Sequence, residues 1–316
     1  MFALLRRLGA LVLTLAVSSF VIFAGMYAAP GDPLSFLIKN PEDRTPDRVA
    51  AVRAAYHLDD SLLQQYLLWL KGVLHGDLGT SFVYKQPVAD LMTTRLPVTL
   101  LLVGMAAVLF IVIGVLLGVV SALKRGSVVD SAITGVTTFL NSVPRFVTAL
   151  VLVAIFAVQL RWFDVSGSGD GFGDRIYHLI LPSITLASGA LVVVSRVTRQ
   201  TMVEQQSLEH VDVARSFGLP RRKIIWRHVL RNSLGPVVTM CGLIVASMLA
   251  GTVVIESVFG LSGVGSMLVD SINAHDFPVV QAILLYMVVA YMTVTVVVDI
   301  LYPLIDPRTR ERSEAT

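Results

Sequence analysis

The sequence predicts an all-α integral membrane protein with six transmembrane helices and a small helical insertion on the outer side after the first of them. Three observations lead to this fold class. Only 15% of the 316 residues are charged and 55% are hydrophobic, whereas a soluble domain carries about 25% charged residues. The hydrophobic residues lie in long uncharged runs. The lysines and arginines gather between these runs, mainly on one side of the predicted membrane.

Six runs approach or exceed the length of about 20 residues that a membrane span requires. They cover residues 8–29, 96–123, 131–160, 176–195, 233–255 and 279–298. The first run has a cleaved signal peptide as its alternative, but the apolar region of such a peptide has only about 7–15 residues. We therefore expect an uncleaved first span whose N-terminus lies in the cytoplasm.

One charged residue, Arg145, interrupts the third run, directly after Pro144. A charged residue within a span is a functional candidate by default, because its burial in lipid is costly. Arg145 is therefore a candidate pathway residue. The alternative is that Pro144 kinks the helix and that Arg145 reaches a partner helix or a water-filled cavity.

Residues 31–95 form the one long polar segment. Its seven basic and eight acidic residues nearly balance, which suits a small soluble module better than an anion-binding surface. The spacing of its apolar residues predicts helices over residues 46–56 and 61–75. The expected divisions of the chain are a first span (1–30), this outer insertion (31–95), a core of five spans (96–306) and a short charged tail (307–316).

Residues 207–232, which we call the elbow, separate the fourth and fifth runs and contain six basic residues. Their pattern predicts two short helices joined by a sharp corner. Ser207 is a good N-cap for the first helix. Gly218 suits the left-handed conformation just past the end of that helix, and Pro220 stops it and can open the next one.

Both elbow helices have an apolar stripe for packing. The stripes comprise Leu208, Val211 and Ala214, with Phe217 and Leu219 at the corner, and then Ile224, Ile225, Val229 and Leu230. A basic second helix is also typical of DNA-binding helix-turn-helix proteins, but the adjoining spans leave no clearance for a helix to enter a groove. A loop that merely orients the protein needs positive charge but no Gly–Pro corner. We therefore expect an interaction element and no nucleic-acid partner.

The distribution of basic residues predicts the orientation. The inner side holds two at the N-terminus, two at Lys124 and Arg125, eight from Arg196 to Arg231 and three in the tail, whereas the two short outer loops hold two. Long loops such as residues 31–95 cross the membrane largely regardless of charge. We expect both termini and the elbow in the cytoplasm.

No residue pattern indicates catalysis or cofactor binding by this chain. Cys241 is the one cysteine, and the six histidines form no metal-binding pattern. The glycines of residues 257–265 lack the Gly-Lys-Ser/Thr of a phosphate loop, and the aspartates of residues 161–175 lack the EF-hand pattern. We expect no catalytic, cofactor-binding or metal-binding residue. An ion-driven carrier normally has paired ionisable groups in its spans, and the apolar runs of this sequence are nearly free of such pairs. A receptor that binds ligand through residues 31–95 is another alternative.

The elbow resembles a loop of known transporters. Residues 212–214, Gly218 and residues 228–231 have the spacing of the EAA loop, which is the coupling helix of ABC importer permeases. Residues 214–220 and 227–232 are similar to the oligopeptide/dipeptide and nickel branch, B-type subunit. Further stretches that resemble this branch are residues 29–33, 56–60, 66–70, 76–81, 257–265 and 299–308. Val213, His228 and Arg231 depart from the general EAA pattern in the way expected of this branch. Two residues depart from what the family usually has: Ser262, where proline is usual, and Arg145, where a small residue is usual.

The resemblance implies a type I ABC importer permease fold in a bacterial cytoplasmic (inner) membrane. It implies a non-catalytic subunit that contacts membrane lipid and works with a second permease, two cytoplasmic ATPases that bind ATP and Mg, and an extracytoplasmic substrate-binding protein. Peptides are the expected substrate; nickel or another small solute is the alternative, and an ion-driven secondary carrier is a more distant one. The implied ATPase-coupling residues are Leu208, Val211, Asp212, Ala214, Arg215, Phe217, Gly218, Leu219, Pro220 and Arg221.

Overall fold

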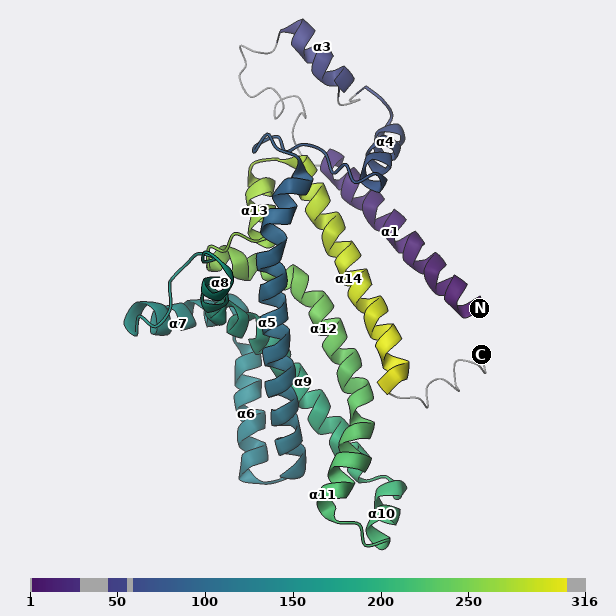
Figure 1. Ribbon diagram of the computed structural model, residues 1–316, viewed down its shortest axis with the longest axis vertical. Coiled ribbons are helices and arrows are strands. Elements are labelled where there is room, and N and C mark those ends of the chain that lie inside the picture. Colours follow the sequence, from purple (N-terminus) through teal and green to yellow (C-terminus); the bar gives the residue numbers. More distant parts are fainter. Residues whose placement is uncertain (1, 29–44, 56–58, 306–316) are drawn as a thin grey trace. The chain divides into compact units, whose positions relative to one another are not determined.

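The structure is a computed structural model that describes residues 2–28, 45–55 and 59–305, and within these residues every regular element is a helix (Figure 1). The elements in chain order are α1 (Phe2–Ala28), α3 (Pro46–Ala55), α4 (Leu62–Leu74), α5 (Val88–Leu123), α6 (Val128–Ser142), α7 (Arg145–Leu152), the π-helix η2 (Val153–Gln159), α8 (Phe172–His178), α9 (Ile180–Gln206), α10 (Glu209–Ser216), α11 (Arg221–Lys223), the π-helix η3 (Ile224–Leu230), α12 (Arg231–Val258), α13 (Val264–Asn273) and α14 (Phe277–Ile305). The all-α prediction is confirmed. The resemblance at residues 29–33, part of residues 56–60 and 299–308, and the predicted tail lie outside the described residues.

Among the described residues, five helices are long and apolar enough to cross a membrane, and a sixth span forms if the bent pair α6 and α7–η2 counts as one. The expected third span is therefore a broken helix and not a continuous one. Val143 is extended, Pro144 caps the start of α7, and the two halves meet at 101°. Proline disfavours helical backbone in the residue before it, which places the break at this step.

Two compact units divide the described chain: residues 1–97 with 263–290, and residues 98–262 with 291–316. In the first unit, α1 packs against α4 through aromatic rings. Tyr66 meets Phe20 edge-on at a centroid distance of 5.3 Å, and its hydroxyl shares a 2.8 Å hydrogen bond with Ser19. Ser61 and Gln64 form a capping box at the start of α4. The helices expected at residues 46–56 and 61–75 are confirmed by α3 and α4.

The first unit also contains a buried carboxylate that ties two distant segments together. Asp276, which directly precedes α14, accepts hydrogen bonds from the Ser81 hydroxyl and from the backbone N–H groups of Phe82 (2.9 Å) and Val83 (3.2 Å). The preceding helix α13 lies between the predicted fifth and sixth spans, where the sequence analysis named no helix. With ten residues, α13 is too short to be recognised in the sequence as a membrane span.

The second unit is built around α9, which packs most extensively against α12 and also against α6 and α7. Helix α5 approaches α9 closely at Gly118, where an added methyl group would lie 2.5 Å from Thr198 Cβ. Small residues allow such close contact between helices in a membrane. The predicted fourth span ended at residue 195 because charged residues follow, but α9 continues to Gln206. A helix does not have to end where its uncharged run ends.

Candidate functional site

The elbow begins where α9 ends. Helix α10 lies between the end of α9 and the start of the helical path that leads into α12 (Figure 1). Ser207 does not cap α10, contrary to the sequence prediction. It is the C-cap of α9, and its hydroxyl donates to the backbone oxygen of Glu204 at 2.7 Å. Leu208 occupies the N-cap position of α10 and makes no side-chain cap. Because α9 continues to Gln206, Ser207 ends that helix and Leu208 takes the position before α10.

The corner of the elbow has the geometry that its sequence predicts. Gly218 has φ +70°, in the left-handed region. Its N–H donates to the Arg215 oxygen (2.9 Å), and the Leu219 N–H donates to the Ala214 oxygen (3.3 Å). These two bonds form a Schellman motif, which satisfies carbonyl groups at the end of a helix. Pro220 follows as the N-cap of the next helix.

The second arm of the elbow differs from the short separate helix that the sequence predicted. Helices α11, η3 and α12 form one uninterrupted helical path from Arg221 to Val258. The expected second elbow helix is therefore the N-terminal end of the fifth span. The wider π-helical turn of η3 rotates the side chains that follow it around the helix axis without interrupting the helix.

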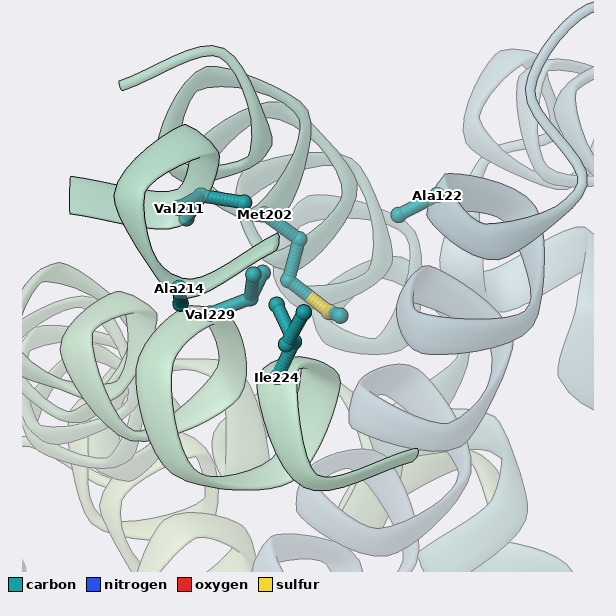
Figure 2. Close-up of a cluster of buried hydrophobic side chains, with 6 residues drawn as sticks. All are labelled: Ala122, Met202, Val211, Ala214, Ile224 and Val229. Carbon is teal, nitrogen blue, oxygen red and sulfur yellow. The ribbon is translucent and has the colours of Figure 1, made fainter. Parts of the chain in front are cut away.

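A buried apolar core joins the elbow to the spans. Val211 and Ala214 from α10 pack with Ile224 and Val229 from η3 and with Met202 from α9. Figure 2 shows these side chains converging, with Ala122 reaching toward them from α5. Because burial of apolar side chains contributes about 1.5–3 kcal/mol for each large one, this core holds α10 firmly on the ends of three helices.

The structure separates the predicted coupling residues into buried and exposed groups. Val211 and Ala214 are buried within the chain, and Leu219 is half-buried. The exposed members are Leu208, Asp212, Arg215, Phe217, Gly218, Pro220 and Arg221. Phe217 is 80% exposed although it belongs to the same apolar stripe. Val213 is exposed beside it and was not among the predicted residues.

Polar contacts complete the elbow. Arg215 Nη1 donates to Asp212 Oδ1 at 2.9 Å on the exposed face of α10. On the other face, Asn232 Nδ2 donates to the His228 oxygen at 2.8 Å and lies 3.4 Å from His210 Nε2. The His210–Asn232 contact links α10 to α12. Sequence reasoning missed it because the two residues are 22 positions apart.

A cavity of about 360 Å³ opens beside the elbow core. Its lining combines apolar side chains with basic and amide side chains: Gln206, Val211, Arg215, Leu219, Arg221, Ile224, Ile225 and Val229. Gln206 Nε2 is buried there without a hydrogen-bond partner among the described residues. The elbow thus presents a hollow as well as the exposed Phe217.

A buried ion pair fixes the neighbouring hairpin between α5 and α6 to α9. Asp130 is almost fully buried and accepts hydrogen bonds from Arg199 Nε (2.7 Å) and Nη2 (2.8 Å). It also accepts from the Ser121 hydroxyl and from the Gly126 N–H (2.9 Å). These four hydrogen bonds offset the cost of burying a carboxylate, which is high unless the group is paired and hydrogen-bonded. No residue pattern indicates this pair, because the two residues are 69 positions apart.

The other predicted site residue, Arg145, lies apart from the elbow. It is the first residue of α7, and its guanidinium approaches Gly189 on α9 and Gly251 on α12. Within the described ranges, no three His, Cys, Asp or Glu side chains come close enough together to hold a metal ion.

Comparisons with known proteins relate this geometry to a family. The family model described as "Binding-protein-dependent transport system inner membrane component" matches residues 114–311, and the model of its N-terminal part matches residues 1–103. The dipeptide transport system permease protein DppB of Lactococcus lactis is 37% identical over 97% of this chain and 98% of its own length. The oligopeptide transport system permease protein AppB of Bacillus subtilis is 37% identical over 94% and 95%.

A solved structure of the MetNI methionine ABC transporter, in an inward-facing conformation, matches with a TM-score of 0.57 at 15% identity. The match covers 68% of this chain and 96% of that one. This match shows that the fold is that of a type I ABC importer permease. The apolar helices and the family model together indicate a multi-pass inner membrane protein. The chain belongs to the family of binding-protein-dependent transport system inner membrane components.

Proposed function

We propose that this chain is one of two permease subunits of an ATP-binding-cassette importer of peptides. The relatives that match nearly its whole length are named for dipeptide and oligopeptide transport. A second, similar permease completes the translocation path, and an extracytoplasmic binding protein delivers the peptide. Two cytoplasmic ATPase subunits bind ATP and Mg and hydrolyse the ATP, so this chain supplies movement and not catalysis.

The observation that carries the proposal is an exposed aromatic side chain on the elbow, which is itself anchored to the spans by a buried core. Phe217 projects from the elbow, while Val211 and Ala214 on the same short helix are buried against the span ends. Large aromatic residues are enriched among the contacts that dominate protein interfaces. A partner that binds Phe217 and then moves would displace α10 together with α9 and α12, because the apolar core joins them.

The exposed polar residues suit the rim of such an interface. Asp212 and Arg215 pair with each other at the surface, and an exposed pair of this kind contributes little to folding. Both remain free to exchange partners when an ATPase subunit docks. We assign the ATPase contact to Phe217, Val213 and Leu208, with Asp212, Arg215 and Arg221 around them. Val211 and Ala214 act as anchors of the elbow.

The first test is Phe217→Ala in the complete complex, with the binding affinity of the ATPase subunits and ATP-driven peptide uptake as measurements. Loss of an interface aromatic at the centre of a contact typically costs 2 kcal/mol or more. We therefore expect the ATPases to bind at least about tenfold more weakly and uptake to fall with it. Phe217 is so exposed that its removal leaves the amount of protein in the membrane unchanged.

The matched control is Phe172→Ala, which removes a similarly exposed phenylalanine from α8. It should bind the ATPases and import peptide like the wild type. Equal behaviour of the two variants would contradict the coupling role of the elbow. Import of nickel but not of peptide by the wild-type complex would instead contradict the substrate assignment.

A further inference from the structure

Arg145 stands at the break of the third span. It is the first residue of α7, directly after Pro144, and the helix halves on either side meet at 101°. Its backbone therefore begins a new helix, and its side chain projects toward the neighbouring helices α9 and α12 of the same unit.

Two glycines, on two different helices, make room for the guanidinium group. A methyl group added at Gly189 would lie 3.3 Å from Nε and 3.4 Å from Nη2 of Arg145, and one added at Gly251 would lie 3.0 Å from Nη1. These distances are shorter than an ordinary contact of about 3.5–4.0 Å. A side chain at either position would crowd the guanidinium, so the pair of glycines fits an arginine in this place.

The guanidinium of Arg145 lies beside two predicted membrane spans, because Gly189 belongs to the apolar run 176–195 and Gly251 to the apolar run 233–255. Runs of this length cross the hydrocarbon core of a bilayer. Arg145 is exposed in the chain and forms no ion pair with the residues that the structure describes. A charged side chain within the membrane is costly unless an anion or water lies beside it.

We propose that Arg145 binds a carboxylate group of the peptide during translocation. A guanidinium offers parallel N–H donors that match the two oxygens of a carboxylate, and an unmodified peptide always ends in such a group. The inference rests on the proposed function, which supplies the peptide. An acidic side chain of the second permease has the same chemistry, and the experiment distinguishes these two sources.

The experiment uses the complete transporter and its binding protein in proteoliposomes. It compares ATP-driven uptake of labelled trialanine with uptake of its C-terminal amide. In Arg145→Gln the ratio of acid to amide uptake should fall about tenfold relative to the wild type, because a charge-assisted pair contributes a factor of at least this order. Arg145→Lys keeps the charge and should give an intermediate ratio. The binding protein is common to all variants, so a change in the ratio reports on the permease.

Two further variants make the test specific. Gly251→Ala keeps the charge but crowds Nη1, and it should lower the ratio in the same direction as Arg145→Gln. Arg161→Gln removes an exposed arginine from the loop after the same span and should leave the ratio unchanged. The amount of each variant in the membrane and its co-purification with the second permease are measured alongside.

Each other outcome has a definite meaning. An unchanged ratio in Arg145→Gln, with normal peptide import by the wild type, would overturn the carboxylate contact and leave the proposed function standing. Equal loss of both peptides together with loss of the second permease would assign Arg145 to an acidic residue of that subunit, which also overturns the inference. Absence of peptide import by the wild-type complex would reject the proposed function and this inference together.

Discussion

Gly218 shows how one residue sets the shape of the elbow. Its left-handed backbone, with φ +70°, lets the chain turn from α10 into α11 while Leu219 folds back onto the elbow core. No atom lies within 4 Å of the position that a Cβ atom would take. Substitution at Gly218 is therefore limited by backbone conformation and not by space, since side chains with branched Cβ atoms are rare in this region.

Gly218→Val and Gly218→Asn separate these two effects. Valine strains the left-handed backbone by about 1–2 kcal/mol, so we expect a displaced α10 and at least a fivefold loss of peptide-stimulated ATP hydrolysis. Asparagine tolerates the left-handed region, so Gly218→Asn should retain activity within about twofold. ATP hydrolysis of the reconstituted complex is the measurement, at matched amounts of membrane-inserted protein. Identical activity of the two variants would show that the corner has no part in coupling.

At the residue scale, the sequence could predict the corner but not which apolar residues face inward. The series Leu208, Val211, Ala214 and Phe217 advances by three residues, and each step turns by about 60° around a helix of 3.6 residues per turn. The series therefore spreads around α10 and does not stay on one face. Only the middle pair reaches the core, and Phe217 is left exposed. This division depends on where α9 and η3 lie, which local sequence does not specify.

At the scale of elements, the Asp130–Arg199 pair holds the α5–α6 hairpin against α9, close to the elbow core. Ala122 follows Ser121 in α5, and Met202 lies one turn beyond Arg199 in α9, so the ion pair and the apolar core share both helices. Together they make the ends of α5, α6 and α9 that lie near the elbow a single support for α10.

Asp130→Asn tests the strength of this support. Removing one partner of a buried ion pair costs about 3–5 kcal/mol, and because the Arg199 side chain is one-third exposed we expect a loss near the lower limit. The thermal unfolding temperature of the purified complex is the measurement. Asp59→Asn is the matched control, because it breaks the exposed pair with Arg53, which has a similar length and contributes about 1 kcal/mol at most. Equal unfolding temperatures would show that the buried pair is not a support.

Helix existence was more predictable than helix ends and helix type. Long apolar runs fixed the number of spans, and the Pro144 step indicated the kink in the third. The two π-helical segments, η2 and η3, could not be predicted because their i→i+5 hydrogen bonds have no simple residue pattern. The contacts between the loop after η2 and the loop after α12 depend on tertiary packing in the same way: the Gly167 N–H donates to the Phe259 oxygen, and the Ser262 N–H donates to the Ser168 hydroxyl.

At the scale of the whole molecule, the distribution of positive charge predicts which ends of the spans face the cytoplasm. Single-cysteine labelling in intact cells tests this orientation in a Cys241→Ala background, which removes the one native thiol. Asp170→Cys, in the loop before α8, should react with a membrane-impermeant maleimide. Ser216→Cys, at the end of α10, should react only after the cells are opened. The opposite pattern would place the elbow on the outer side and exclude contact with cytoplasmic ATPases.

The uninterrupted helical path from Arg221 to Val258 carries the elbow near one end and Gly251 near the other, separated by about 45 Å. Linkage between two binding events is reciprocal by thermodynamic necessity. If nucleotide binding by the ATPase subunit weakens ligand binding at Arg145, then ligand binding at Arg145 must weaken nucleotide binding by the same factor. An occupied translocation path would therefore lower the nucleotide affinity of the ATPase through the same continuous helix that connects the elbow to Gly251.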